Sequence, residues 1–205
     1  RLLKQARFEI YKSLEGYDFS NIDIPETINI EGLREGEYID KTENLVFYGP
    51  VGTGKTHLAI ALGIEACNRG KKVRFFKVAH LVNELIEASE RGELRRFTTS
   101  LNKYDLLICD EWGYIPISLR GAELLFQVIA DFYERKSLII TTNLEFGKWI
   151  SIFMNKKLLL PLLTILTISG CNNNSSISTS SSSSISSSII SSISSGLIFP
   201  IPTSI

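Results

Sequence analysis

The clearest chemical pattern in this 205-residue chain is a glycine-rich segment, GPVGTGKT, at residues 49–56. It matches the pattern G-x-x-x-x-G-K-[ST] between an apolar run and a stretch of helical periodicity, a context that a chance glycine-rich turn does not explain. Glycines let the backbone wrap tightly and aim its N–H groups at phosphate oxygens, and the following helix adds its positive end. The pattern predicts that Lys55 contacts the β- and γ-phosphates of a nucleotide and that the Thr56 hydroxyl binds Mg²⁺. The predicted nucleotide-binding residues are Gly49, Pro50, Val51, Gly52, Thr53, Gly54, Lys55, Thr56 and His57.

Two acidic residues, Asp110 and Glu111, follow the apolar run LLIC at 106–109. In α/β folds the carboxyl ends of the strands form the ligand-binding edge, so a strand ending here would deliver two carboxylates to that edge. We expect Asp110 to hold Mg²⁺, largely through the water that this ion keeps. We expect Glu111 to orient and deprotonate an attacking water. Asp-Glu after an apolar run also occurs at solvated strand ends, and it is the preceding glycine-rich loop that favours the catalytic interpretation.

A third candidate, Asn143, follows the apolar run SLIITT at 137–142. Its side-chain amide could hydrogen-bond the attacking water or the γ-phosphate. Asn is also frequent in turns after strands. Both interpretations stay open at this point.

The elements that must position these residues alternate between strands and helices. Short apolar runs predict the strands, and helical periodicity predicts the helices between them. This alternation predicts an α/β fold in which a parallel sheet has helices on both faces. The predicted strands are 44–48, 72–78, 105–109 and 137–142, and the predicted helices are 2–14, 55–68, 79–88, 91–101 and 121–135.

The overall composition is that of a globular domain, with 44% hydrophobic and 21% charged residues. Lys+Arg and Asp+Glu both number 22, so net charge argues neither for nor against a polyanionic partner. Three widely spaced cysteines exclude a disulfide scaffold and a four-cysteine zinc site, and they suit a reducing compartment. We therefore expect a cytoplasmic location.

The composition changes after residue 149, where the only charged side chains are Lys156 and Lys157. Residues 171–205 include 16 Ser and 8 Ile, which predicts a disordered low-complexity tail. Before it, Met154 and the two lysines precede the apolar run LLLPLLTILTI, and Cys171 follows that run. This order resembles a bacterial lipoprotein signal peptide, and a frameshifted or random extension is the alternative. A membrane partner is expected only if the segment acts as such a signal.

Longer stretches of the chain resemble the IstB-like ATP-binding proteins, which are helper ATPases of insertion-sequence transposition and relatives of the DnaC-type helicase loaders within the AAA+ class. The resemblance is carried by RLLKQARF at 1–8, YDFS at 17–20, ENLVFYGPVGTGKTHLAIALGIEAC at 43–67, LVNELIEA at 81–88, YDLLICDEWGYIPI at 104–117, GAELLFQVIADFYERKSLIITTN at 121–143 and F-x-x-W at 146–149. By that resemblance Lys55 and Thr56 contact the nucleotide and Mg²⁺. Asp110 and Glu111 are the Walker B pair, and Asn143 is the sensor-1 residue.

The resemblance implies ATP and Mg²⁺ as cofactors, and a function as an ATP-binding helper of DNA transposition. It implies non-specific DNA and a transposase as partners, and a homo-oligomer that assembles head to tail on DNA. A DnaC-like helicase loader is the first alternative. A nucleotide-binding remnant that does not turn ATP over is the second.

Parts of the family pattern are missing from the chain. Family members continue past the tryptophan into a helix with an Asp-Arg-Leu-like segment, whose Arg completes the neighbouring subunit's site, and then into a fifth strand beside the first. No Arg follows Arg135, so we expect ATP hydrolysis to be impaired. We also expect the fifth strand to be missing, which would leave strand 44–48 at an open edge. The expected organisation is an N-terminal helical, DNA-binding remnant at 1–43, a truncated AAA+ domain at 44–153, the signal-like segment at 154–171 and the Ser/Ile-rich tail at 172–205.

A small basic face is a further candidate for function, because Arg91, Arg95 and Arg96 fall on one predicted helix. A solvated helix face and a contact with DNA phosphates are both compatible with this pattern.

Overall fold

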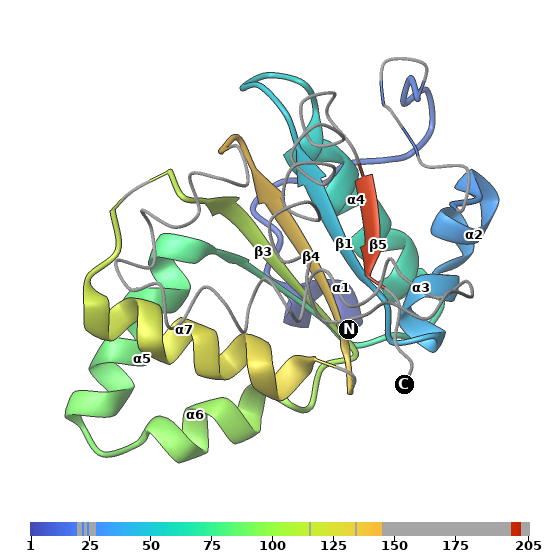
Figure 1. Ribbon diagram of the computed structural model, residues 1–205. Helices are drawn as coiled ribbons and strands as arrows, with labels where there is room; N and C mark the ends of the chain where they lie inside the picture. Colours follow the sequence, from blue (N-terminus) through green and yellow to red (C-terminus); the bar gives the residue numbers. More distant parts are fainter. Residues whose placement is uncertain are drawn as a thin grey trace, which may run out of the picture.

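The computed structural model describes residues 1–19, 22, 24, 28–114, 116–133, 135–144 and 198–201, along which strands and helices alternate (Figure 1). The helices are α1 (Leu2–Ala6), α2 (Ile30–Glu35), α3 (Glu37–Asp40), α4 (Lys55–Asn68), α5 (Val78–Glu90), α6 (Leu94–Leu101) and α7 (Leu119–Phe132). The strands are β1 (Asn44–Tyr48), β2 (Val73–Lys77), β3 (Leu106–Trp112), β4 (Ser137–Thr142) and β5 (Ile198–Ile201).

Strands β1 to β4 form the parallel sheet that the sequence predicts. The strand order is β2-β3-β4-β1-β5, with parallel pairing of β2 with β3, β3 with β4 and β4 with β1. The strand that leads into the glycine-rich loop therefore lies beside the strand that leads to Asn143. The carboxyl ends of β1, β3 and β4 meet at one edge of the sheet, which is where the predicted site residues lie.

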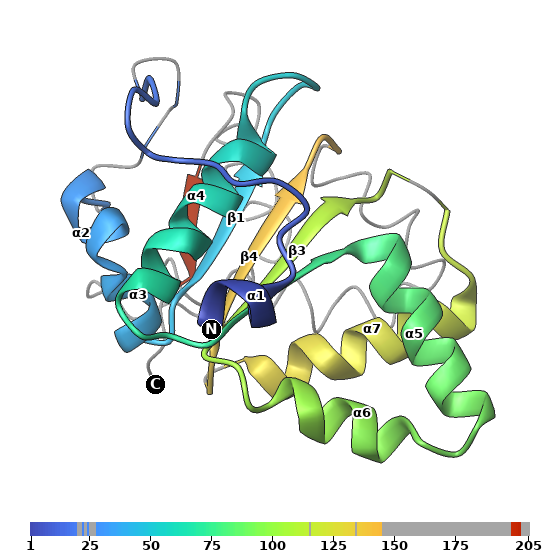
Figure 2. The ribbon, with the colours of Figure 1, turned by 180° about the vertical axis from the view of Figure 1, so that it is seen from behind.

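Alternating side chains of the strands enter two separate cores, one on each face of the sheet. On β1, Leu45 and Phe47 belong to the core that includes α4, whereas Val46 belongs to the core that includes α5 and α7. Helices α5 and α7 lie in front of the sheet in Figure 1, and α1 and α4 lie in front of it in Figure 2. Near-continuous apolar strands are typical of a parallel sheet that is covered on both faces.

The prediction that β1 lies at an open edge is wrong in this structure. Strand β5 pairs antiparallel with β1, from Asn44 opposite Ile201 to Phe47 opposite Ile198. An apolar strand with unpaired N–H and C=O groups favours such pairing, and here a short segment of the predicted tail supplies it. Pro200, which has no N–H, is tolerated in β5 because β5 is the edge strand.

The N-terminal helix is shorter than the predicted helix 2–14. Helix α1 ends at Ala6 because Arg7 adopts a left-handed conformation with φ of 57°. The chain then crosses the α4 face of the sheet, where the ring of Phe8 packs 6.0 Å from that of Phe75. Helices α2 and α3, which the sequence did not predict, pack into the same core.

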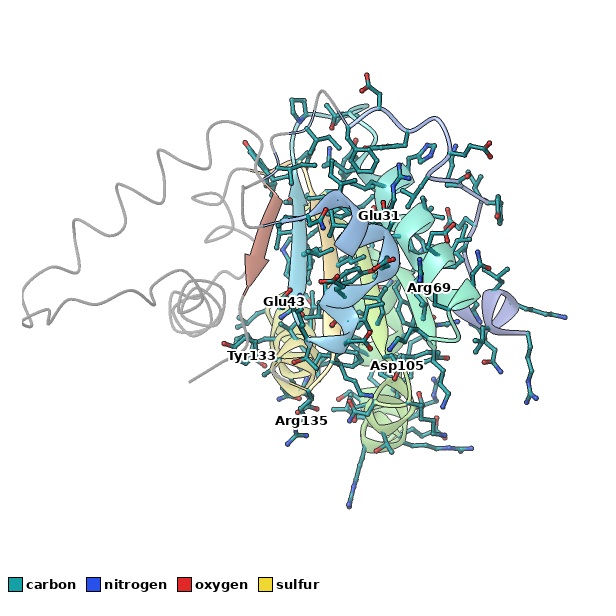
Figure 3. The ribbon with its side chains drawn as sticks, turned by 90° about the vertical axis from the view of Figure 1, so that its right-hand side faces the viewer. Glu31, Glu43, Arg69, Asp105, Tyr133 and Arg135 are labelled. Atoms are coloured by element: carbon teal, nitrogen blue, oxygen red, sulfur yellow. The ribbon has the colours of Figure 1, made fainter. Side chains whose placement is uncertain are left out.

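Polar contacts connect neighbouring strands at the end of the sheet opposite the glycine-rich loop. Asp105, just before β3, accepts a hydrogen bond from the Lys72 N–H at 2.9 Å and pairs with the Lys136 ammonium at 3.4 Å. Figure 3 shows Asp105 and Arg135 at this lower end of the molecule. These contacts hold the beginnings of β2, β3 and β4 together.

The signal-like segment 154–171 lies outside the described residues, and so does the tail 172–205 except for β5. Within the described ranges, none of the helices has the length and apolar character that crossing a membrane requires.

Candidate functional site

The glycine-rich loop connects β1 to α4 at the upper edge of the sheet in Figure 1. Gly52 and Gly54 both have φ of 85°, a conformation that residues with a Cβ adopt only at a cost. Gly54 caps the N-terminus of α4, so the first N–H groups of the helix face back toward the loop. The Gly49 N–H donates to the Thr142 carbonyl at 3.3 Å, which ties the loop to β4. The tip of the loop, residues 50–53, is exposed to solvent.

Lys55 folds its ammonium group back over this loop. Its Nζ donates to the carbonyl of Gly49 at 2.7 Å and to that of Pro50 at 2.6 Å, and it lies 3.3 Å from the Thr53 hydroxyl. Burial lowers the pKa of Lys55, and the nearby Asp110 carboxylate partly opposes that shift. A positive charge held inside a loop of glycine-rich backbone is suited to binding a polyphosphate.

Thr56 and Asp110, which are 54 residues apart in the sequence, are in direct contact. The Thr56 hydroxyl donates to Oδ1 of Asp110 at 2.8 Å, and the Thr141 hydroxyl donates to the same oxygen. Asp110 is fully buried, and its Oδ2 has no hydrogen-bond partner among the described residues. An unpartnered buried carboxylate oxygen is costly, which makes it available to a cation or water.

These residues fit a Mg²⁺ ion. A hydroxyl beside a carboxylate is the protein ligand set that Mg²⁺ uses in phosphate-binding loops, where water and phosphate oxygens supply the other ligands. In the part of the chain that the structure describes, no three His, Cys, Asp or Glu side chains gather into a larger metal cluster.

Glu111 follows Asp110 in β3, but its backbone departs from the strand. The register between β3 and β4 shifts just before Trp112, and Glu111 has φ of 60°. The Glu111 N–H donates to the Thr141 hydroxyl at 3.0 Å. Its side chain is 43% exposed, and its carboxylate lies 3.8 Å from the ammonium group of Lys77. A non-glycine residue in a left-handed conformation is uncommon and is held there by its surroundings.

Asn143 follows β4 directly and lies at the same edge of the sheet. Its Oδ1 is buried and has no hydrogen-bond partner among the described residues. An unpartnered amide oxygen at this position is compatible with a contact to water or ligand. Its role as a sensor of the γ-phosphate stays a prediction.

His57 faces the N-terminal segment rather than the tip of the loop. Its Nε2 lies 2.9 Å from the Ser13 carbonyl, and its ring centroid lies 5.2 Å from that of Tyr17. The Tyr17 hydroxyl donates to the Gly54 carbonyl at 3.4 Å. These contacts hold the N-terminal segment against the start of α4, and the predicted contact of His57 with nucleotide stays a prediction.

Sequence reasoning missed Thr141 and Lys77. Thr141 is buried in a strand that is covered on both faces, and a buried hydroxyl needs partners, so its position in SLIITT was a usable signal. Lys77 ends β2 in the same sheet and stands opposite Asp110 in the register of β2 and β3. A lysine at the carboxyl end of a predicted parallel strand could therefore have been placed near the acidic pair.

The three arginines of the predicted helix 91–101 differ from one another in their contacts. Arg91 pairs with Glu87 at 3.5 Å and with Glu93 at 3.3 Å. Arg95 and Arg96 are exposed on α6, which lies at the end of the molecule away from the glycine-rich loop in Figure 1.

Proteins of insertion sequences are similar to this chain over most of its length. It is 39% identical over 148 residues to a protein of Geobacillus stearothermophilus named as the ATP-binding protein of insertion sequence IS5376, a match that covers 72% of this chain and 59% of the relative. It is 38% identical over 154 residues to the corresponding protein of insertion sequence IS21 from Pseudomonas aeruginosa. That match covers 74% of this chain and 57% of the relative. The chain thus spans less than two thirds of the length of these relatives.

Solved structures with a similar fold include replication proteins. The crystal structure of the DnaC helicase loader has a TM-score of 0.58 and 22% identity, and the match covers 75% of this chain and 92% of that chain. The structure of the replication initiator DnaA bound to AMPPCP and single-stranded DNA has a TM-score of 0.56 and 22% identity, and the match covers 72% of this chain and 47% of that chain. At this identity the likeness shows the fold, which is that of AAA+ P-loop proteins. The family model described as "IstB-like ATP binding protein" matches residues 1–175, and the chain therefore belongs to that family.

Proposed function

We propose that the chain binds ATP with Mg²⁺ as a helper of DNA transposition, and that it hydrolyses ATP slowly. The observation that carries this proposal is the contact between Thr56 and Asp110 beside the loop that holds Lys55. Two distant parts of the sequence thereby bring a hydroxyl, a buried carboxylate and an ammonium group to one edge of the sheet. In P-loop proteins this set binds a nucleoside triphosphate together with Mg²⁺.

Each residue has a definite task in the proposed reaction. The N–H groups of the loop and of α4 bind phosphate oxygens, and Lys55 leaves the loop carbonyls to contact the β- and γ-phosphates. Thr56 and, through water, Asp110 hold Mg²⁺, which neutralises phosphate charge when it is bound. Glu111 accepts a proton from the attacking water, and Asn143 orients that water or contacts the γ-phosphate.

The proposed partners are a transposase and DNA. Both relatives named above are ATP-binding proteins of insertion sequences, which supports a transposase as the client. We propose non-specific DNA as the second partner, with the exposed Arg95 and Arg96 as contacts to its phosphates, and a homo-oligomer as the form that assembles on it. A helicase loader would use the same fold, so the identity of the client decides between the two functions.

Hydrolysis is tested with radiolabelled ATP under single-turnover conditions, with and without DNA. We expect Glu111→Gln to keep ATP binding and to lose hydrolysis. The matched variant Glu123→Gln removes a carboxylate from an ion pair with Arg120 on α7, at 3.6 Å, and should hydrolyse ATP like the wild type. Equal hydrolysis by the wild type and Glu111→Gln would contradict the role given to Glu111.

The client is tested by capture on the immobilised chain. A transposase of an insertion sequence and a replicative helicase are offered separately, with ATP or with ADP. Capture of the transposase that depends on ATP supports the transposition helper. Capture of the helicase in its place would favour a helicase loader.

A further inference from the structure

Positively charged side chains stand where three neighbouring strands begin, at the end of the sheet opposite the glycine-rich loop. Lys72 directly precedes β2, Lys103 lies between α6 and β3, and Arg135 precedes β4. All three side chains are exposed. Among the described residues, none of the three has a carboxylate within ion-pair distance. Lys72, Lys103 and Arg135 together are called the basal surface.

Backbone hydrogen bonds fix the spacing of these positions. The Asp105 N–H donates to the Lys72 carbonyl at 2.7 Å, and the Ser137 N–H donates to the Asp105 carbonyl at 3.2 Å. The beginnings of β2, β3 and β4 therefore adjoin in this order, and since neighbouring strands lie about 4.8 Å apart, the basal surface extends about 10 Å across the sheet. The Tyr104 N–H donates to the last carbonyl of α6 at 3.0 Å, so the chain turns tightly at Lys103.

Two carboxylates beside the basal surface are engaged by other groups. Asp105 accepts the Lys72 N–H at 2.9 Å and pairs with the Lys136 ammonium at 3.4 Å. Asp40 pairs with the ammonium group of Lys71. These two acids therefore leave the three charges of the basal surface uncompensated. Like charges about 5–10 Å apart repel one another, and a polyanion that binds there removes the repulsion.

The two ends of the sheet differ in charge. The end with the glycine-rich loop carries Asp110 and Glu111, whereas the opposite end carries the basal surface and, next to it on α6, the exposed Arg95 and Arg96. Helix α6 lies at the lower end of the molecule in Figure 1, and Figure 3 shows Arg135 at that end. A DNA duplex carries one negative charge per about 1.7 Å of helix axis, so a surface about 10 Å wide faces several phosphates at once.

We propose that the basal surface binds the phosphate backbone of DNA and extends the contact made by Arg95 and Arg96. The inference rests on the proposed function, in which non-specific DNA is a partner. Lysine and arginine side chains that contact phosphates do not read bases, so this binding is independent of sequence and weakens with salt. Because the nucleotide site lies at the other end of the sheet, the chain binds DNA and ATP at the same time.

The test measures binding of a fluorescent DNA duplex by anisotropy, in the wild type and in a basal variant that combines Lys72→Gln, Lys103→Gln and Arg135→Gln. An exposed ion pair changes an equilibrium by about two- to fivefold, so the basal variant should bind DNA at least about tenfold more weakly. The slope of log affinity against log salt should become shallower by about two to three, close to one for each lost phosphate contact. ATP affinity should equal that of the wild type, which shows that the variant is folded.

A control variant removes the same number of positive charges elsewhere. It combines Lys41→Gln, Arg91→Gln and Arg120→Gln, whose charges are paired with carboxylates at 2.8 Å, 3.5 Å and 3.6 Å. Because these charges are already compensated, the control variant should lose less DNA affinity than the basal variant. Equal losses in the two variants would show that only net charge matters and would overturn the proposal.

A second readout locates the DNA on the wild-type protein. Acetylation of lysines, followed by mass spectrometry, should slow at Lys72 and Lys103 when DNA is bound. It should not change at Lys12, which lies beside the contact of Ser13 with His57. A wild type that binds DNA without protecting Lys72 and Lys103 would overturn the basal surface and leave the proposed function standing. A wild type that binds no DNA would contradict the proposed DNA partner, and this surface with it.

Discussion

Replacement of Thr141 by valine should destabilise the protein, because one hydroxyl serves both acidic residues of the site. The hydroxyl donates to Oδ1 of Asp110 and accepts the Glu111 N–H at 3.0 Å. A hydrogen bond to a charged group contributes about 1.5–3 kcal/mol and a neutral one about 0.5–1.5 kcal/mol. The added methyl group of valine returns about 0.8 kcal/mol if it is buried. We therefore expect Thr141→Val to lower the free energy of unfolding by about 2–3 kcal/mol.

Urea unfolding at neutral pH without nucleotide measures this effect. For a chain of this size a loss of 2–3 kcal/mol corresponds to a fall in Tm of about 4–12 °C. The matched variant is Thr142→Val, whose hydroxyl donates to the Trp112 carbonyl at 2.9 Å and accepts the Leu144 N–H at 3.1 Å, both neutral groups. It should lose less stability and should keep the Mg²⁺ dependence of ATP binding. Stability of Thr141→Val within about 0.5 kcal/mol of the wild type would refute this reasoning.

Two other predictions concern the loop and the thiols. Gly54→Ala should lower the Tm more than Gly70→Ala does, since both glycines have φ near 85° but only the Cβ at residue 54 would approach a side chain, the Tyr17 hydroxyl at 3.2 Å. Equal losses in thermal unfolding would show that this contact does not matter. Burial raises the pKa of the Cys67 thiol to about 11 and that of Cys109 to about 12, so in a Cys171→Ser variant at pH 8 neither should react with iodoacetamide until urea unfolds the chain. Rapid labelling of the folded protein, measured by mass spectrometry, would contradict their burial.

Local patterns were enough to predict the nucleotide loop and the strand that carries the acidic pair. The positive φ of Gly52 and Gly54 is a property of the loop itself, so the spacing of the glycines already implied it. The apolar run before Asp110 predicted a buried parallel strand, and parallel strands that share a sheet bring their carboxyl ends to one edge. The contact between Thr56 and Asp110 follows from these two facts.

Contacts that depend on the path of the chain could not be predicted in the same way. Helix α1 already ends at Ala6, and the chain then brings Phe8 against Phe75, a contact between residues far apart in the sequence. The pairing of Glu9 with Lys77 depends on that path. Strand β5 is a similar case, because the short apolar run IFPI does not specify that its partner is β1, which is far away in the sequence.

The central claim is that the loop residues and Asp110 form one site for ATP and Mg²⁺. Calorimetric titration of ATP into the wild type and Lys55→Ala, with Mg²⁺ or with EDTA, tests it most directly. We predict that the wild type binds ATP more tightly with Mg²⁺, and that Lys55→Ala loses about tenfold or more in affinity, as expected for a lost charge-assisted contact. Lys71→Ala, which removes a lysine paired with Asp40, should bind like the wild type. Equal ATP binding by the wild type and Lys55→Ala, with no effect of Mg²⁺ in either, would contradict the claim.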